Sequence, residues 1–280
     1  MRVIQGFDRA GERVVALGTF DGVHRGHRAL LIRAKAEAEA RGCPLRVYTF
    51  DRHPLEVIAP EHAPGILTTI PEKAERMAAL GVDEMQVVHF GTETASMSPE
   101  EFLRTLRRDM TVLAVVAGWN YTFGRNAAGS AETLRADGNR CGYGVLIEDA
   151  KMLDGKPVSS SRVREALGQG DIEAVNELLL VPYTVTGTVL RDGREKTGSG
   201  VLCLQAGKRK MLPAPGAYTC IVKVRDEYGL GTVYTGPWED RILRLRLQYP
   251  CPPAAVGEKI RLTLTGKAPG ELKNGKDGHK

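Results

Sequence analysis

The sequence predicts an α/β fold, with a doubly wound parallel sheet in the first two thirds of the chain and a small antiparallel β-barrel after it. Up to Pro182, short apolar runs alternate with segments of helical spacing, which is the pattern of strand–helix–strand units. From Tyr183 onward, apolar residues alternate with polar ones, and turn residues separate the runs. We therefore expect a first domain over residues 1–182, a barrel over residues 183–265, and a basic flexible tail over residues 266–280.

A histidine-containing turn lies between the first predicted strand and helix. Residues 13–17 form a short, mainly apolar run, and residues 28–41 carry apolar side chains at helical spacing. His24 and His27 lie between them, where a helix start offers free backbone N–H groups and the positive end of its dipole. Such a junction binds phosphate. Three glycines would let a polyphosphate approach the backbone: Gly18, Gly22 and Gly26.

A helix cap and a zinc site are the alternative roles for these histidines. A single histidine at a helix start is usually a cap or a surface group, but a pair of histidines among three glycines directly after an apolar run favours a functional site. A His-x-x-His pair supplies only two zinc ligands, and no nearby Cys or carboxylate pair has the spacing to complete a tetrahedral site.

The remaining elements follow in the same alternation. Strands are predicted over residues 45–50, 82–90, 112–117 and 145–147, and helices near residues 71–80, 98–106, 130–135, 161–167 and 170–179. The barrel strands are predicted over residues 183–189, 218–224, 242–247 and 259–264.

Two loops that follow predicted strands carry further candidates. His53 follows the strand 45–50, and Asn120 and Phe123 follow the strand 112–117. The carboxyl ends of parallel strands are where open α/β sheets bind ligands. The alternatives are that His53 is a surface histidine and that Phe123 belongs to the core.

A second candidate anion site lies at the predicted helix start near residue 160. Ser159 and Ser160 precede Arg162 and Arg164, and hydroxyl groups beside arginines at a helix N-terminus favour phosphate. Plain helix capping would also explain the serines.

Several of these motifs carry a resemblance. The stretch Gly-Thr-Phe-Asp-Gly-Val-His-Arg-Gly-His at 18–27 resembles the signature of the adenylyltransferase module of bacterial FAD synthetases, within the HxGH nucleotidyltransferase superfamily. The segments at 50–54, 118–124 and 158–164 resemble other motifs of that family. The resemblance implies a Rossmann-like domain that transfers AMP from ATP to FMN, giving FAD and pyrophosphate with Mg²⁺.

The resemblance also implies a role for each motif. Catalysis would rest on His24, His27 and Arg162. The implied nucleotide-binding residues are Gly18, Phe20, Asp21, Gly22, Gly26, Ser159, Ser160 and Arg164, and the implied flavin or phosphate contacts are His53, Asn120 and Phe123. The metal ligands stay open, since Asp21 is either a ligand or a loop-closing residue.

The expected mechanism is direct in-line attack of the FMN phosphate on the α-phosphorus of ATP, with catalysis by positioning and charge stabilisation. Two alternatives remain open. One is an HxGH nucleotidyltransferase with a different nucleotide, such as CTP, or a different acceptor. The other is a non-catalytic flavin- or nucleotide-binding protein.

The second domain resembles the riboflavin kinase barrel of the bifunctional family but departs from it. At the loop that aligns with Gly-x-Pro-Thr-Ala-Asn, Val201 and Cys203 replace the threonine and asparagine expected to meet magnesium and phosphate. The strand expected to present a catalytic glutamate carries Arg244 and Arg246 and no acid. We therefore expect a kinase-like barrel without riboflavin kinase activity.

Composition and charge argue against a membrane protein, a secreted protein and a nucleic-acid-binding protein. The chain has 280 residues, 42% hydrophobic and 26% charged, which is typical of a soluble globular protein. No apolar run approaches the ~20 residues that span a bilayer, and the start lacks a signal-peptide pattern, so we expect a cytoplasmic protein without a membrane partner. The net charge of +5 comes from the part after Pro182. Its arginines alternate with apolar residues, which favours a solvated surface over a nucleic-acid site.

Overall fold

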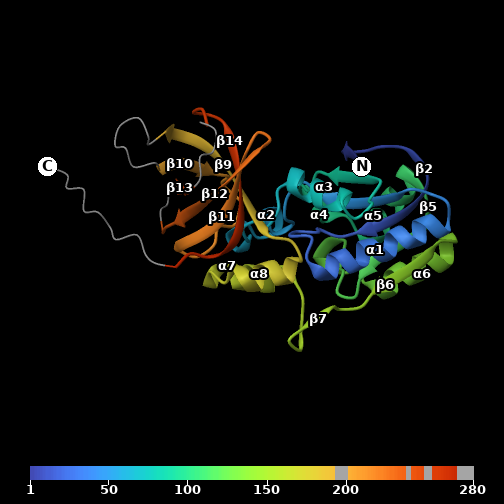
Figure 1. Cartoon of the computed structure of the whole chain (residues 1–280). Coiled ribbons are helices and arrows are strands. Elements are labelled where there is room, and N and C mark those ends of the chain that lie inside the picture. Colours follow the sequence, from blue (N-terminus) through green and yellow to red (C-terminus); the bar gives the residue numbers. More distant parts are fainter. Residues whose placement is uncertain (193–200, 238–240, 249–253, 270–280) are drawn as a thin grey trace. The chain divides into compact units, whose positions relative to one another are not determined.

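The computed structural model describes all residues except 193–200, 238–240, 249–253 and 270–280 (Figure 1). The chain divides into two compact units, Met1–Ser160 and Ser161–Lys280. Apart from Ser160, helices α7 (Ser160–Gln169) and α8 (Ile172–Leu179) therefore fall in the second unit, while the functional boundary that we expect after Pro182 stays a prediction.

The first unit is built on a six-stranded sheet with the order β1-β4-β3-β2-β5-β6, in which every neighbouring pair is parallel. Its strands are β1 (Arg2–Gln5), β2 (Ala10–Leu17), β3 (Leu45–Phe50), β4 (Glu84–Val88), β5 (Met110–Gly118) and β6 (Gly144–Glu148). The predicted parallel sheet is confirmed, with β1 as an additional edge strand.

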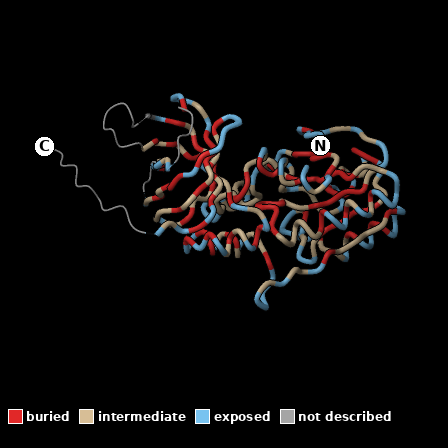
Figure 2. Tube along the Cα trace, viewed as in Figure 1, coloured by how far each residue is buried: buried red, intermediate tan, exposed pale blue. Residues whose placement is uncertain are grey.

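Alternate residues of the central strands supply the two faces of this sheet. Val14 and Ala16 of β2 belong to one buried cluster, whereas Val15 and Leu17 belong to the other. Helices α1 (Arg25–Ala40) and α3 (Ile70–Ala78) contribute to the first cluster, and α5 (Pro99–Asp109) and α6 (Ala131–Cys141) to the second. Because both faces are covered, β3 and β4 are buried along nearly all of their length, and the carboxyl halves of β2 and β5 are buried as well (Figure 2).

The helix starts follow the capping residues in the sequence. The hydroxyl groups of Thr69 and Ser98 accept hydrogen bonds from backbone N–H groups of α3 and α5, and Glu72 and Glu101 complete two capping boxes. The short elements of this unit are α2 (Leu55–Ile58), a 3₁₀ turn (Pro60–His62), α4 (Thr92–Ser96), a 3₁₀ turn (Arg125–Ala127), and the paired strands β7 (Met152–Leu153) and β8 (Lys156–Pro157).

The strand order places a switch point between β2 and β5. From β2 the chain passes through α1 to β3 on one side, and β5 later adds on the other side of β2. The loops at the carboxyl ends of these two strands therefore lie at the position where open α/β sheets bind ligands. The histidine turn follows β2, and the loop with Asn120 follows β5.

The second unit contains α7 (Ser160–Gln169), α8 (Ile172–Leu179) and a closed antiparallel barrel of order β10-β13-β12-β11-β14-β9. The barrel strands are β9 (Tyr183–Asp192), β10 (Val201–Ala206), β11 (Gly216–Val224), β12 (Glu227–Thr235), β13 (Ile242–Leu247) and β14 (Lys259–Lys267). The predicted barrel is confirmed. Most of the expected tail lies outside the described residues, and β14 reaches Lys267.

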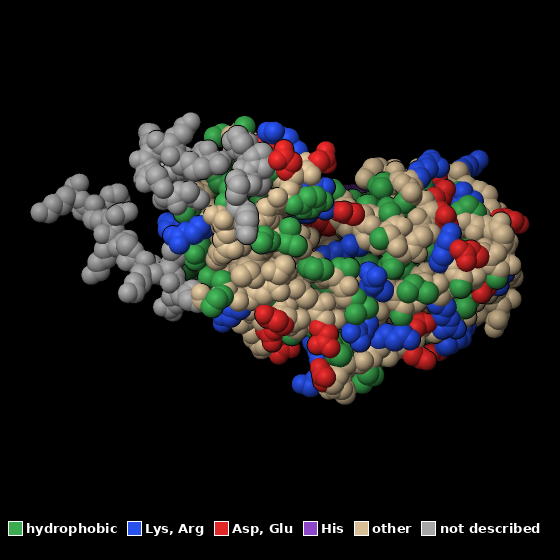
Figure 3. Space-filling model, viewed as in Figure 1, with side chains coloured by type: hydrophobic (Ala, Val, Ile, Leu, Met, Phe, Trp, Pro, Cys, Tyr) green, Lys and Arg blue, Asp and Glu red, His purple; other side chains and the backbone are tan. Residues whose placement is uncertain are grey.

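The exposed face of the first unit mixes charges of both signs (Figure 3). Several lie in i,i+4 pairs such as Arg41 with Glu37 at 2.6 Å. Among the described residues, no helix has the length and apolar character needed to cross a membrane.

At the amino ends of the strands, a buried ion network stabilises the sheet, and removing Glu84 is expected to cost about 3–5 kcal/mol of stability. Fully buried Arg46 donates to Glu84 at 2.7 Å and to Asp8 at 2.8 Å, and Arg13 donates to Glu84 at 2.9 Å. Urea unfolding of Glu84→Ala at pH 7 would measure the loss. The exposed Glu93→Ala serves as the control and should stay near wild type.

The stability lost in Glu84→Ala is also expected to depend on pH. Burial raises the pKa of Glu84, but hydrogen bonds from Arg13 and Arg46 outweigh it and hold the value below that of an ordinary glutamate. The ionised carboxylate therefore stabilises the fold above the ordinary pKa, and this contribution is lost as pH falls through the folded value. The stability gap between wild type and Glu84→Ala should narrow on acidification, and a gap that stays constant between pH 7 and pH 4 would contradict the assignment.

Candidate functional site

The loop after β2 holds an unusual backbone conformation. Phe20 has φ 50°, Gly22 has φ 87° and Val23 has φ 45°. A positive φ is strained for a β-branched residue such as Val23 and persists only where the surroundings fix it. Gly18 is needed for a different reason, since a Cβ there would lie 3.1 Å from the Phe20 ring.

The segment around the start of α3 fixes this loop. The Asp21 carboxylate accepts hydrogen bonds from the backbone N–H groups of Leu67 and Thr68 at 2.9 Å, and the Thr68 hydroxyl accepts from the Gly22 N–H at 2.9 Å. Arg76 donates to the Gly22 carbonyl at 2.7 Å. Asp21 therefore closes the loop, which is one of the two roles that the sequence left open.

The two histidines converge at the start of α1. His24 is the N-cap residue, and its Nδ1 accepts a hydrogen bond from the His27 N–H at 3.3 Å. The two rings stack with centroids 3.6 Å apart and planes 14° apart. A Cβ at Gly26 would lie 3.3 Å from the His24 ring, so glycine keeps room for this arrangement. The helix begins three residues earlier than predicted, and the pair therefore lies within its first turn.

His27 is held as a neutral side chain. Its ring lies between His24 and the edge of Phe20, whose centroid is 5.2 Å away. Burial, followed by the charges of His24 and Lys73, lowers the pKa of His27 well below the ordinary value. The buried Nδ1 atom has no hydrogen-bond partner within the described part of the chain. A neutral imidazole with an unsatisfied polar atom is suited to contact a ligand.

Sequence reasoning gave Lys73 no role at the site. The side chain is buried, and its ammonium donates to the Thr19 carbonyl at 2.6 Å and to the Thr49 hydroxyl at 3.3 Å. Burial lowers the pKa of Lys73 to about 8, although Asp21 acts to raise it. The sequence carries one signal that Lys73 faces inward: it lies four residues before the buried Met77, on the same inner face of α3.

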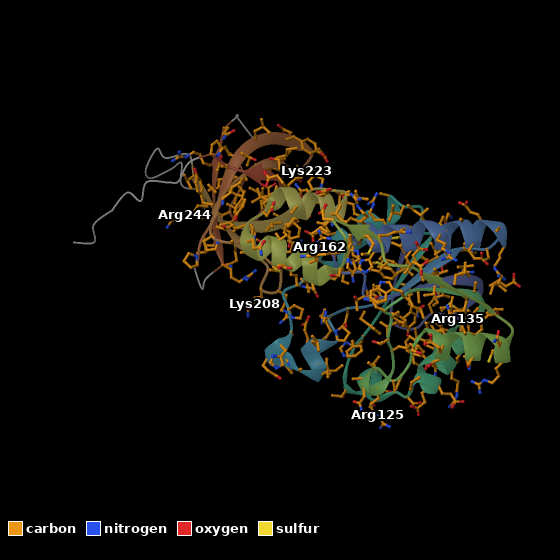
Figure 4. All side chains as sticks on the ribbon, turned by 90° about the horizontal axis from the view of Figure 1, so that it is seen from below. Arg125, Arg135, Arg162, Lys208, Lys223 and Arg244 are labelled. Carbon is orange, nitrogen blue, oxygen red and sulfur yellow. The ribbon has the colours of Figure 1, made fainter. Side chains whose placement is uncertain are left out.

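One of the two predicted serines meets the histidine loop. The Ser160 hydroxyl donates to the Asp21 carbonyl at 2.8 Å, and the Val158 carbonyl lies 3.7 Å from the Cβ position of Gly26. Ser159 is half-buried beside it in the chain. Arg162, labelled in Figure 4, and Arg164 are half-buried residues of α7 in the second unit. Their proximity to the histidines stays a prediction.

The other candidates lie in the loops after β3 and β5. His53 Nδ1 accepts a hydrogen bond from the Leu55 N–H at 3.2 Å, so this nitrogen organises the start of α2. Asn120 is exposed directly after β5. Phe123 lies in the core and packs on Phe102 with ring centroids 5.3 Å apart. This is the alternative role that the sequence allowed for Phe123. Flavin contacts by these residues stay predictions.

Comparison with known proteins identifies the family. A family model described as FAD synthetase matches residues 7–162, which is more than half of the chain. The chain belongs to the FAD synthetase family. The match covers the histidine loop, the loops after β3 and β5, and the chain up to Arg162.

The relatives of this FAD synthetase-family chain include bifunctional riboflavin kinase/FMN adenylyltransferases. That of Listeria monocytogenes is 37% identical over 229 residues, covering 80% of this chain and 72% of the relative. Those of Bacillus subtilis and Escherichia coli K12 are 32% and 30% identical, and the alignments cover 82% and 78% of this chain and 72% of each relative. A crystal structure described as a macrolide-efflux protein from Streptococcus pneumoniae has a TM-score of 0.85 at 24% identity, over 98% of this chain and 93% of that one. This likeness confirms the fold.

The FAD synthetase resemblance implies magnesium. Among the described residues, no group of three or more His, Cys, Asp or Glu side chains is arranged to hold a metal ion. The Asp21 carboxylate is engaged with backbone N–H groups. The metal ligands, which the sequence left open, therefore stay open in the described part of the chain.

Proposed function

We propose that this chain is an FMN adenylyltransferase, which transfers AMP from ATP to FMN and releases FAD and pyrophosphate. The observation that carries the proposal is the neutral His27, stacked on His24 at the N-terminus of α1, whose Nδ1 has no hydrogen-bond partner among the described residues. The first N–H groups of a helix and its positive dipole end favour a phosphate at this position. The strained, glycine-containing loop lets the polyphosphate approach the backbone.

The reaction requires little proton transfer. An oxygen of the FMN phosphate attacks the α-phosphorus of ATP, a new P–O bond forms, and the bond to the β-phosphate oxygen breaks, so that pyrophosphate leaves with the electron pair. Because the FMN phosphate is already anionic, no general base is needed. Catalysis then rests on alignment of the two phosphates and on hydrogen bonds to the oxygens where negative charge develops.

His24 and His27 perform complementary parts of this task. His24 holds the first turn of α1 through its bond to the His27 N–H, which fixes both rings. His27 donates a hydrogen bond to an α- or β-phosphate oxygen as an N–H of the neutral imidazole. A magnesium ion bound to the ATP phosphates would neutralise part of their charge.

The arginines of α7 are proposed to bind the leaving pyrophosphate. Replacing Arg162 or Arg164 with glutamine is expected to raise KM for ATP about tenfold or more, because a charge-assisted hydrogen bond contributes about 1.5–3 kcal/mol. KM for FMN should change little. Arg135→Gln, on the exposed surface of α6 (Figure 4), is the matched control. Steady-state kinetics with each substrate varied would test this, and an unchanged KM for ATP in both variants would refute the role.

A direct test of the function uses purified protein with Mg²⁺ and four substrate pairs: ATP or CTP with FMN or riboflavin. Chromatography then separates the flavins. The proposal predicts FAD from ATP and FMN alone. A product from CTP would indicate a different nucleotide specificity, and binding without any product would indicate a non-catalytic protein.

A further inference from the structure

The helix α3 and the residues before it contact three positions of the histidine loop between β2 and α1: Thr19, Asp21 and Gly22. Thr19 is held by Lys73, Asp21 by Leu67 and Thr68, and Gly22 by Thr68 and Arg76. A conformation with two positive-φ non-glycine residues persists because of such contacts. Position 73 is the one among these where an ionisable amine is buried.

A purely structural role does not explain a lysine here. Burying an ammonium costs free energy unless an opposite charge pairs with it. Within the described part of the chain, the Lys73 ammonium donates to a carbonyl and a hydroxyl, and no carboxylate lies within ion-pair distance. An apolar residue would fill this buried position at a lower free-energy cost. The Thr19 carbonyl also needs no lysine as a donor, because it already accepts a hydrogen bond from the Thr49 hydroxyl at 3.1 Å.

The location of the charge indicates what it does. The Lys73 ammonium is bonded to the loop at the Thr19 carbonyl, and its charge acts to lower the pKa of His27. A positive charge at this position would attract an anion bound at His27, whose Nδ1 lacks a hydrogen-bond partner within the described ranges.

We propose that Lys73 is a positioning residue for the ATP phosphates: its buried ammonium holds the Thr19 carbonyl and supplies a fixed positive charge at the histidine loop. This inference rests on the proposed function and adds a residue from α3 to the site.

The groups that face Lys73 determine its pH dependence. The Asp21 carboxylate favours the charged ammonium, and His27 from α1 is held neutral. The end of β3 presents the Thr49 hydroxyl, and on α3 itself Glu72 is bonded to the Thr69 N–H and Arg76 to the Gly22 carbonyl. With a pKa of about 8, the ammonium is charged at pH 7 and loses its proton as pH rises further. The affinity for ATP should therefore fall above about pH 8, although bound ATP shifts the midpoint upward.

The same titration separates function from folding. The pKa of Lys73 in the folded state lies below its ordinary value, so the unfolded state binds more protons between the two values. The charged form thus destabilises the fold at pH 7. Removing the amine should leave the melting temperature unchanged or raise it.

The experiment compares wild type, Lys73→Met, Lys73→Arg and Lys35→Met by calorimetric titration with MgATP and by thermal melting between pH 6.5 and pH 9.5. Lys35 of α1 pairs with Asp83 at 2.9 Å and controls for the loss of a lysine. We expect Lys73→Met to weaken ATP binding about tenfold or more at pH 7, without a lower melting temperature and without the alkaline decline. Lys73→Arg should keep affinity at high pH, and Lys35→Met should bind ATP as wild type does.

Two outcomes would overturn the proposal. One is ATP affinity within twofold of wild type in Lys73→Met. The other is a parallel fall of melting temperature and affinity, with the alkaline decline unchanged, which would assign Lys73 to folding alone. Because ATP binding is measured without catalysis, a wild-type protein that makes no FAD would refute the proposed function and leave this test of Lys73 intact.

Discussion

Replacing His27 with alanine is expected to lower kcat for FAD synthesis about 10²–10³-fold, the usual loss when one donor to a developing negative charge is removed. The melting temperature should change little, because the His27 Nδ1 has no hydrogen-bond partner in the described fold that the substitution would break. Stopped-time assays of FAD at saturating ATP and FMN, together with thermal melting, would measure both quantities.

His24 and His62 supply the comparison variants. His24→Ala removes a ring from the site and also the N-cap of α1, so it should lower both turnover and stability, the latter by about 1 kcal/mol. The exposed His62 lies in the 3₁₀ turn Pro60–His62, away from the histidine pair in the sequence. His62→Ala should therefore behave as wild type. Full activity in both His24→Ala and His27→Ala would refute the assignment of phosphate binding to this pair.

The protein is also expected to form no FMN from riboflavin, ATP and Mg²⁺. Val201 and Cys203 lie on β10, where Val201 is directly opposite Arg246 and Cys203 is opposite Arg244 of β13. Their neighbours Leu202 and Leu204 are buried, so the four side chains share the outer face of the barrel, and Arg244 points away from the strands in Figure 4. Valine offers no oxygen to magnesium, cysteine is a soft ligand, and arginine cannot accept a proton from the flavin hydroxyl.

Chromatography of the flavins after incubation with riboflavin would test the absence of kinase activity. The positive control is FAD synthesis from FMN by the same preparation, which shows that the enzyme is active. FMN formed at a catalytic rate would contradict the prediction and would show that the kinase loop aligns elsewhere. The preceding residues Gly198–Gly200 of that alignment lie outside the described residues.

Most of the fold follows from hydrophobic pattern. The runs that form β3 and β5 are buried on both faces, and Ser98, where the helix 98–106 is predicted to begin, is the N-cap of α5. The edge strand β1 is not predictable in this way, because only Ile4 of its four residues is buried, which leaves no periodic signal. The strand β10 falls in the segment that alignment to the kinase motif assigns to a loop, although Leu202, Leu204 and Ala206 alternate as barrel residues do.

The site is predictable where its chemistry is local in the sequence. His24, Gly26 and His27 form a motif within four residues, and the two rings stack at the start of α1. Lys73 belongs to no such motif, because it reaches the loop from a separate helix, 54 residues after Thr19. The interactions of Asp21 likewise depend on residues 67 and 68, so its loop-closing role is visible only in the structure.

The fate of the α-phosphate tests the proposed reaction most directly. Purified protein would be incubated with FMN, Mg²⁺ and ATP labelled at the α-phosphorus, and FAD, AMP and pyrophosphate would be quantified for wild type and His27→Ala. We predict that the label enters FAD, with one pyrophosphate released per FAD, and that His27→Ala slows this at least about 100-fold. Label that remains in ATP or appears in free AMP without FAD, or equal rates in the two proteins, would contradict the proposed reaction.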